Sequence, residues 1–167
     1  SDSMESIASL PPLDELKDCD LELCTTLANV TGRADVAQLQ IRDATKFISS
    51  LDAETTKLKE IAFETCDANL MVDFLTRYKK IESLAMMETT ANQGKILRAL
   101  EGSQLKALEL HVNRKKHPSD DHSDEIAAIS ALISTMDLKS LSVNVFNEKV
   151  SRALTMRNTI SSLKLFG

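Results

Sequence analysis

The chain has few of the residues that build β-rich folds and no segment that would place it in a membrane. Among its 167 residues are four glycines, three prolines, one tyrosine and no tryptophan. Sandwiches and barrels need many turns and aromatic-rich strands, so the composition argues against both. No apolar run approaches the ~18 residues of a transmembrane helix. Residues 1–10 also lack the basic start and apolar stretch of a signal peptide, so we expect neither a membrane span nor an export signal.

Cysteine is scarce too, with Cys19, Cys24 and Cys66 as its three occurrences. An odd number without C-x-x-C spacing is typical of reduced thiols in the cytosol or nucleus. Cys19 and Cys24 lie five positions apart, which on a helix places them on different faces and makes a poor chelate. The three histidines lie in or near the polar segment 117–122 and are interpreted as solvated linker residues. We therefore expect no bound metal and no cofactor.

Local signatures of catalysis are missing as well. No Ser-His-Asp set, H-E-x-x-H pair or EF-hand spacing occurs. Gly94-Lys95 lacks the first glycine and the following Ser or Thr of a phosphate-binding loop. The sequence therefore predicts a protein that is not an enzyme.

What the chain does contain is 43% apolar residues, many of them recurring at intervals of three, four and seven. Such one-sided stripes are typical of amphipathic helices. They predict an all-α fold of eight or so helices, with no clear internal repeat. The expected helical segments are 13–30, 34–50, 52–65, 70–81, 86–91, 96–100, 105–112, 126–136 and 146–163.

Two residues mark helix ends within this pattern. Asp67 is a candidate N-cap for the helix over 70–81. Gly102 is a candidate terminator for the helix over 96–100. The expected core of residues 57–117 combines the apolar positions of these stripes: Leu58, Ile61, Leu70, Phe74, Tyr78, Ile81, Leu84, Ile96, Leu97 and Leu100.

Charge is distributed unevenly along the chain. Lys and Arg exceed Asp and Glu by three in residues 57–117 (11 − 8), whereas residues 1–56 carry −7 (4 − 11) and residues 118–167 carry −1 (5 − 6). A mildly basic module between acidic flanks indicates a binding surface. The run Arg114-Lys115-Lys116 is short and the whole chain is acidic, so direct binding of nucleic acid is not favoured.

The basic module also contains spaced motifs. Cys66-Asp67 is followed seventeen residues later by Leu84, which ends a run with Tyr78 and Ile81 at three-residue spacing. The segments GKILRAL (94–100) and QLKA (104–107) come next. In these motifs residues 57–117 resemble the integrase-binding domain of the LEDGF/hepatoma-derived growth factor family, itself similar to the TFIIS N-terminal domain. The chain departs from the family at Cys66, Leu105 and Ala107, where the family has Ile, Phe and Val, and at Met86-Met87, which replaces an aliphatic–Thr pair.

The resemblance implies a compact right-handed helical bundle within a chromatin-associated adaptor of the nucleus. Two interhelical loops of such a bundle bind disordered, acidic, Phe-containing motifs of nuclear partner proteins. Asp67, beside Cys66, would accept hydrogen bonds from the partner's backbone, and Leu105 and Ala107 would pack against its Phe. Lys57 and Lys59 would attract its acidic residues.

Each of these residues also has a plainer interpretation. Asp67 serves equally well as a simple N-cap, and Leu105 and Ala107 as ordinary core residues. The alternative function is helical dimerisation or assembly through segments 13–30 and 146–163, whose apolar faces need a partner in cis or in trans. In either case we expect one folded unit: an N-terminal helical extension (1–56), the LEDGF-like bundle (57–117) and a C-terminal helical extension (118–167).

Overall fold

A computed structural model describes residues 38–113, 122–157 and 159–166 of the chain. Strands and helices alternate along these residues without exception. The elements are β1 (Gln38–Asp43), α3 (Thr45–Ser50), β2 (Glu60–Thr65), α4 (Ala68–Arg77), β3 (Ser83–Met86), α5 (Gln93–Ala99), β4 (Ala107–Leu110), α6 (Ser123–Thr135), β5 (Ser140–Val143), α7 (Glu148–Met156) and β6 (Ser162–Leu165).

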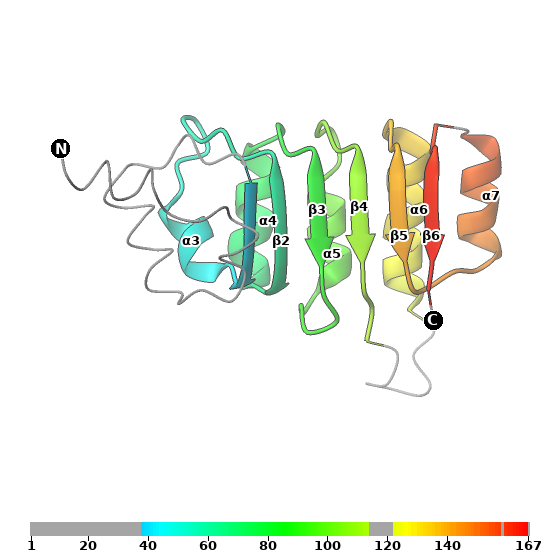
Figure 1. Cartoon of the computed structure of the whole chain (residues 1–167), viewed down its shortest axis with the longest axis horizontal. Coiled ribbons are helices and arrows are strands. Elements are labelled where there is room, and N and C mark those ends of the chain that lie inside the picture. The colour runs from blue at the N-terminus through cyan, green and yellow to red at the C-terminus, as the bar shows by residue number, and fades with distance from the viewer. Residues whose placement is uncertain (1–37, 114–121, 158, 167) are drawn as a thin grey trace.

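The described strands form one parallel sheet whose spatial order is the order of the chain, β1-β2-β3-β4-β5-β6. Figure 1 shows α4, α5 and α6 behind this sheet, and each consecutive pair of helices from α3 to α7 is in contact. A doubly wound sheet would reverse its strand order and carry helices on both faces. Here the order never reverses and the helices form a single layer, so the fold is an α/β solenoid of stacked β–α units.

A sequence repeat underlies these units. The strands begin at 38, 60, 83, 107, 140 and 162, so successive starts lie 22, 23, 24, 33 and 22 residues apart. Around each strand from β2 onward the apolar residues follow the pattern L-x-x-L-x-L. The five sets are Leu58/Ile61/Phe63, Ile81/Leu84/Met86, Leu105/Leu108/Leu110, Leu138/Leu141/Val143 and Ile160/Leu163/Leu165.

Parallel register stacks these sets into rows beneath the helix layer. Ile61 is the register partner of Leu84, and Leu84 of Leu108. Both neighbours of every such residue in the strand point to the opposite face. All members of the sets from β2 to β5 are buried. One unit alone leaves its apolar row exposed, so the core forms only when several units stack.

Polar side chains complete the hydrogen bonding where the strands end. The Asn144 side chain donates to the Val112 carbonyl (2.8 Å) and accepts from the Val112 N–H (2.7 Å). The buried amide of Gln93 donates to the carbonyls of Met87 and His111, both at 3.0 Å. Buried backbone groups left unpaired are destabilising, and these side chains pair them at the carboxyl ends of β3, β4 and β5.

The expectation of an all-α helical bundle was therefore wrong. In L-x-x-L-x-L the first two apolar residues are three apart, which matches a helix, and only the third follows at the spacing of a strand. Segments 52–65 and 105–112 were assigned to helices for this reason, whereas they contain β2 and β4. Segment 86–91 is not a helix either, and its first residue, Met86, is the last residue of β3. The repeat was missed as well.

Other segments were partly or fully correct. Segments 70–81, 96–100 and 126–136 correspond to α4, α5 and α6. Segment 34–50 divides into β1 and α3, and segment 146–163 into α7 and part of β6. Segment 13–30 lies outside the described residues. The expected core is buried with one exception, Leu70, whose exposed fraction is 38%.

The sheet crosses both of the expected domain boundaries. β1 precedes residue 57 and pairs with β2, and β5 follows residue 117 and pairs with β4. Residues 57–117 thus supply the middle of a continuous sheet, and the described residues on either side add strands as well as helices.

Phe74 offers a test of the packing between α4 and the sheet. Its exposed fraction is 2%, and its ring stacks on Tyr78 with centroids 5.2 Å apart. Phe74→Ala should lower the free energy of unfolding by about 3–5 kcal/mol, because it leaves a cavity in the core. Urea denaturation measures this change. Leu70→Ala on the same helix is the control and should have an effect below about 1 kcal/mol; equal effects would contradict the placement of α4.

Candidate functional site

The candidate site is the face of the sheet that lies away from the helix layer. Strand residues alternate between the two faces, and those between the buried leucines point to this side. In β2 to β5 every such residue is half-buried or exposed. No described helix packs against it, and we refer to it below as the open face.

The centre of the open face consists of small side chains. Register partners run from Ser83 through Ala107 to Ser140 in one row, and Ala62 pairs with Ala85 in the next, in which the charged Glu109 follows on β4. Ala and Ser reach little beyond the backbone. The side chains in the middle of the face therefore project only slightly from the sheet, and longer polar side chains lie on either side of them.

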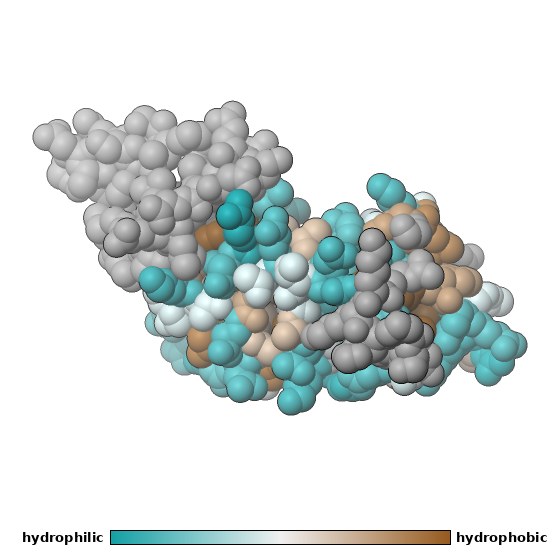
Figure 2. Space-filling model, turned by 90° about the horizontal axis from the view of Figure 1, so that it is seen from below, coloured by the Kyte–Doolittle hydropathy of each residue, from teal (hydrophilic) through white to brown (hydrophobic). Residues whose placement is uncertain are grey.

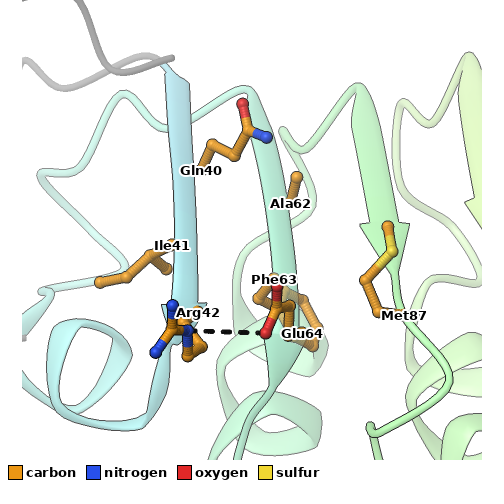
Figure 3. A pocket seen from close by; sticks show the side chains of 7 residues that line it. All are labelled: Gln40, Ile41, Arg42, Ala62, Phe63, Glu64 and Met87. Atoms are coloured by element: carbon orange, nitrogen blue, oxygen red, sulfur yellow. Dashed lines mark ion pairs between the residues drawn. The ribbon is translucent and has the colours of Figure 1, made fainter. Parts of the chain in front are cut away.

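At the β1–β2 side a hollow of about 110 Å³ lies in this face. Figure 3 shows its lining, in which Gln40 and Ala62 come from paired positions of β1 and β2 and Met87 follows β3. Arg42 and Glu64 form an ion pair at 3.7 Å. Ala62 leaves space that a longer side chain would fill. Ile41, Ala62 and Met87 belong to the apolar part of the lining, and Arg42 and Glu64 add one charge of each sign.

The β4–β6 side of the face carries a second group of polar and aromatic residues. Nε2 of His111 lies 3.2 Å from Oε2 of Glu109. The His111 ring contacts Phe166 with centroids 4.5 Å apart, and Nζ of Lys164 lies 6.0 Å from the centre of the Phe166 ring. The small centre is thus flanked by charged and aromatic side chains at both sides.

The structure does not bring together the residues that the resemblance selected. Cys66 and Asp67 follow the carboxyl end of β2, whereas Lys57 and Lys59 precede its amino end. Leu105 lies just before β4, at the same end of the sheet as Lys57. The expected pocket between two loops is therefore not formed. The loop with Cys66 and Asp67 lies at the carboxyl end of the strands, and the loop with Leu105 lies at their amino end.

At the amino end, Leu105 is fully buried, as the core interpretation of this residue required. Ala107 is the first residue of β4 and belongs to the open face. Lys57 and Lys59 are exposed, and Lys59 lies 3.7 Å from Glu82. Lys106, 3.2 Å from Glu82, and then Lys59 hold the pKa of the Glu82 carboxyl below its usual value.

At the carboxyl end, Asp67 is exposed and caps α4 by accepting a hydrogen bond from the Leu70 N–H at 3.0 Å. The Asp67 N–H in turn donates to the Thr45 hydroxyl at 2.9 Å. Cys66 is buried, and its thiol lies 3.5 Å from the Asp67 carbonyl. Burial raises the pKa of the Cys66 thiol to about 11, so the thiol is protonated at neutral pH.

Among the described residues, no group of three or more His, Cys, Asp or Glu side chains is placed to hold a metal ion. Within the same part of the chain, no helix is long and apolar enough to cross a membrane. No protein-family model matches the chain, and neither a curated protein nor a solved structure matches it.

Sequence reasoning missed most of the open face, including Gln40, Ala62, Ala85 and Ser142. The available signal was the set of positions between the leucines of the repeat. Once L-x-x-L-x-L is aligned, the residue before and the residue after the second leucine fall on the open face of every strand. Of the expected site residues only Ala107 lies there.

Asp67 allows a test of its role as a cap. Asp67→Ala should lower the free energy of unfolding by about 1 kcal/mol, whereas Asp67→Asn should change it by only a few tenths, because Asn also caps helices. Thermal or urea denaturation measures both. Asp73→Ala, which removes an exposed carboxylate paired with Arg77 inside the same helix, should have an effect of about 0.5 kcal/mol or less. An effect of Asp67→Ala no larger than that of Asp73→Ala would argue against the cap.

Cys66 gives a prediction for pH. Its folded-state pKa of about 11 exceeds the ordinary 9.0, so the folded state holds the thiol proton more tightly than the unfolded state does. The resulting stability is present below pH 9 and is lost as the pH rises toward 11. The stability advantage of the wild type over Cys66→Ala should therefore shrink between pH 9 and 11 in urea denaturation. A gap that stays constant over this range would contradict burial of the thiol.

Proposed function

We propose that this protein is a binding module that holds a partner protein against the open face of its sheet. The observation that carries the proposal is the composition of that face: small side chains along its centre and charged or aromatic side chains on both sides. The pattern L-x-x-L-x-L, in β–α units of 22–24 residues with one of 33 residues between the starts of β4 and β5, resembles leucine-rich repeats, which line an extended binding surface with parallel strands.

The low centre explains how a partner would approach. Ala62, Ala85 and Ala107 bring the sheet backbone close to anything that lies on them. A helix or extended segment can therefore lie across several strands without displacing a large side chain. The area available grows with each strand, since every unit adds one residue to each row.

The sides of the face indicate the chemistry of the partner. The hollow of about 110 Å³ over Ala62 suits a single apolar side chain, with the Arg42–Glu64 pair beside it. Glu109 and Lys164 supply charges of opposite sign at the other side. Charges in such positions mainly fix orientation and accelerate association. The partner is thus expected to present an apolar anchor flanked by charges of both signs.

This proposal keeps the expected partner binding and moves it to another surface. The adaptor for acidic, Phe-containing motifs depended on two loops of a bundle, and the described residues form no such pocket. Asp67 and Cys66 are accounted for by capping and burial. Localisation in the nucleus and the lack of enzymatic activity stay predictions.

Ala85→Arg provides the test, because it places a long charged side chain at the centre of the face. Binders are selected from a displayed library of natural protein segments with the wild-type protein as bait, and their affinities are then measured against variants. Segments that use the open face should bind Ala85→Arg at least about tenfold more weakly. Ala62→Arg, which fills the hollow, should act in the same direction.

The matched control is Ala127→Arg, a half-buried alanine of α6 in the helix layer. It should leave the affinities unchanged, and all three variants should keep the wild-type circular dichroism spectrum. Selected segments that bind Ala85→Arg and the wild type equally, or that lose binding with Ala127→Arg, would contradict the proposal.

A further inference from the structure

A row of charged residues borders the open face where the strands begin. It consists of the residue just before each of β2 to β5, and we refer to it below as the amino-end row. Its members are Lys59, Glu82, Lys106 and Lys139. The backbone N–H of each member after Lys59 donates to the carbonyl of the member before it, at 2.7 to 2.8 Å. The row therefore continues the sheet by one residue, and its members lie one strand spacing, about 4.8 Å, apart.

The amino-end row carries more positive than negative charge. Its three lysines are exposed. Its one acid, Glu82, lies 3.7 Å from Lys59 and 3.2 Å from Lys106, so a single carboxylate is shared by two ammonium groups. Lys139 forms no ion pair with any residue that the structure describes, because the nearby Asp137 pairs with Arg157 at 2.7 Å.

The loops around this row have the same excess of positive charge. The loops that lead into β2 to β6 carry seven Lys or Arg and five Asp or Glu (7 − 5 = +2), in a chain whose net charge is −5. These loops are 51–59, 78–82, 100–106, 136–139 and 157–161. Positive charge gathered at one end of the sheet attracts negatively charged groups of a partner.

Beside the amino-end row, the open face has a strip of small side chains that we call the small strip. It is formed by the first residues of β3 to β6, which are register partners: Ser83, Ala107, Ser140 and Ser162. The long side chains of the next row reach away from this strip, toward the carboxyl ends of the strands. Glu109 contacts His111 at 3.2 Å, and Nζ of Lys164 lies 6.0 Å from the centre of the Phe166 ring. A segment that lies along the small strip therefore has the lysines of the amino-end row along one flank.

The carboxyl end of the sheet has a different surface. Figure 2 views the molecule from this end, toward which the arrows of Figure 1 point, and shows apolar residues in brown over the C-terminal elements. Phe146 and Leu165 in this region have exposed fractions of 46 and 48%. An acidic side chain of a partner is thus matched by charge at the amino end of the strands and by none of these apolar residues at the other.

Taking the proposed function as given, we propose that the partner lies along the small strip and directs a series of acidic side chains toward the amino-end row. Lys106 and Lys139 precede β4 and β5, the two middle strands of the strip, and contribute most of the attraction. A partner carboxylate between these two lysines meets two ammonium groups that Glu82 neutralises only in part. Lys59 and the exposed Lys80 extend the positive charge toward β2 and β3.

Charge reversal at the two middle lysines tests this orientation. Segments are selected from the displayed library with the wild type as bait, and those whose binding is weakened by Ala85→Arg are sequenced and titrated. They should contain more Asp and Glu than the unselected library. Lys106→Glu/Lys139→Glu should weaken their binding at least about tenfold, mainly through slower association. Changing the acidic residues of a segment to Asn and Gln should weaken its binding to the wild type in the same way.

The matched control reverses two exposed lysines of the helix layer, Lys95→Glu in α5 and Lys149→Glu in α7. It changes the net charge by the same amount, but on the other side of the sheet, where salt screens the effect. The affinities should therefore stay within about twofold of the wild type at about 0.15 M salt. Lys106→Gln/Lys139→Gln removes the two charges without placing new carboxylates beside Glu82. It decides the question if the Glu variant loses the wild-type circular dichroism spectrum, and it should weaken binding at least about threefold.

The outcomes separate this inference from the proposed function. Segments that respond to Ala85→Arg but bind the lysine variants as tightly as they bind the helix-layer control overturn the inference and leave the proposed function intact. Segments of the same kind with no excess of Asp and Glu overturn it as well. If no selected segment responds to Ala85→Arg, the proposed function fails and the inference fails with it.

Discussion

Stacking of the apolar rows is the interaction on which the rest of the structure depends. Each β–α unit contributes one residue to each row, so the row through Ile61, Leu84, Leu108 and Leu141 is shared by four strands. The one strand and one helix of a single unit cannot bury its leucines without the neighbouring units. The units therefore stabilise one another in series, and burial of any one row member depends on the unit before it and the unit after it.

The same constraint determines what the two faces of the sheet can do. The helix side must be apolar at every strand, which leaves only the residues between the leucines free to vary. Ala62 and Ala85 precede Phe63 and Met86 in the sequence, yet their side chains point away from the core and do not pack in it. Binding chemistry on the open face can therefore change from strand to strand while the core stays as it is. The longer spacing between β4 and β5, 33 residues by their starting positions, shows that connections can lengthen without breaking the row.

Some of this structure was predictable from the sequence. α4 and α6 carry enough apolar residues at helical spacing to be recognised, and Asp67 and Gly102 mark ends that the structure retains, Gly102 with a φ of +78° that suits glycine. The strands were harder, because four-residue strands such as β4 offer only two inward positions. Leu105 and Leu108 then supply a three-residue interval that a helix would also produce. Aligning Leu58, Ile81, Leu105, Leu138 and Ile160 would have separated the two patterns. The open face was not predictable before that alignment, since its alanines and serines carry no local signal.

The strand order of the sheet also bears on how the chain folds. Every strand pairs with the strand next to it in the chain, and each helix packs on its chain neighbours. Most contacts between elements thus join segments about one unit apart, so closing each loop carries a small entropic penalty. A chain built this way can nucleate at any well-packed pair of units and extend in both directions. In such a chain, local unfolding at one end of the sheet can also occur without unfolding at the other end. Among the described residues β6 pairs only with β5, so its amide hydrogens should exchange through local fraying, whereas exchange in β3 should require several units to open together.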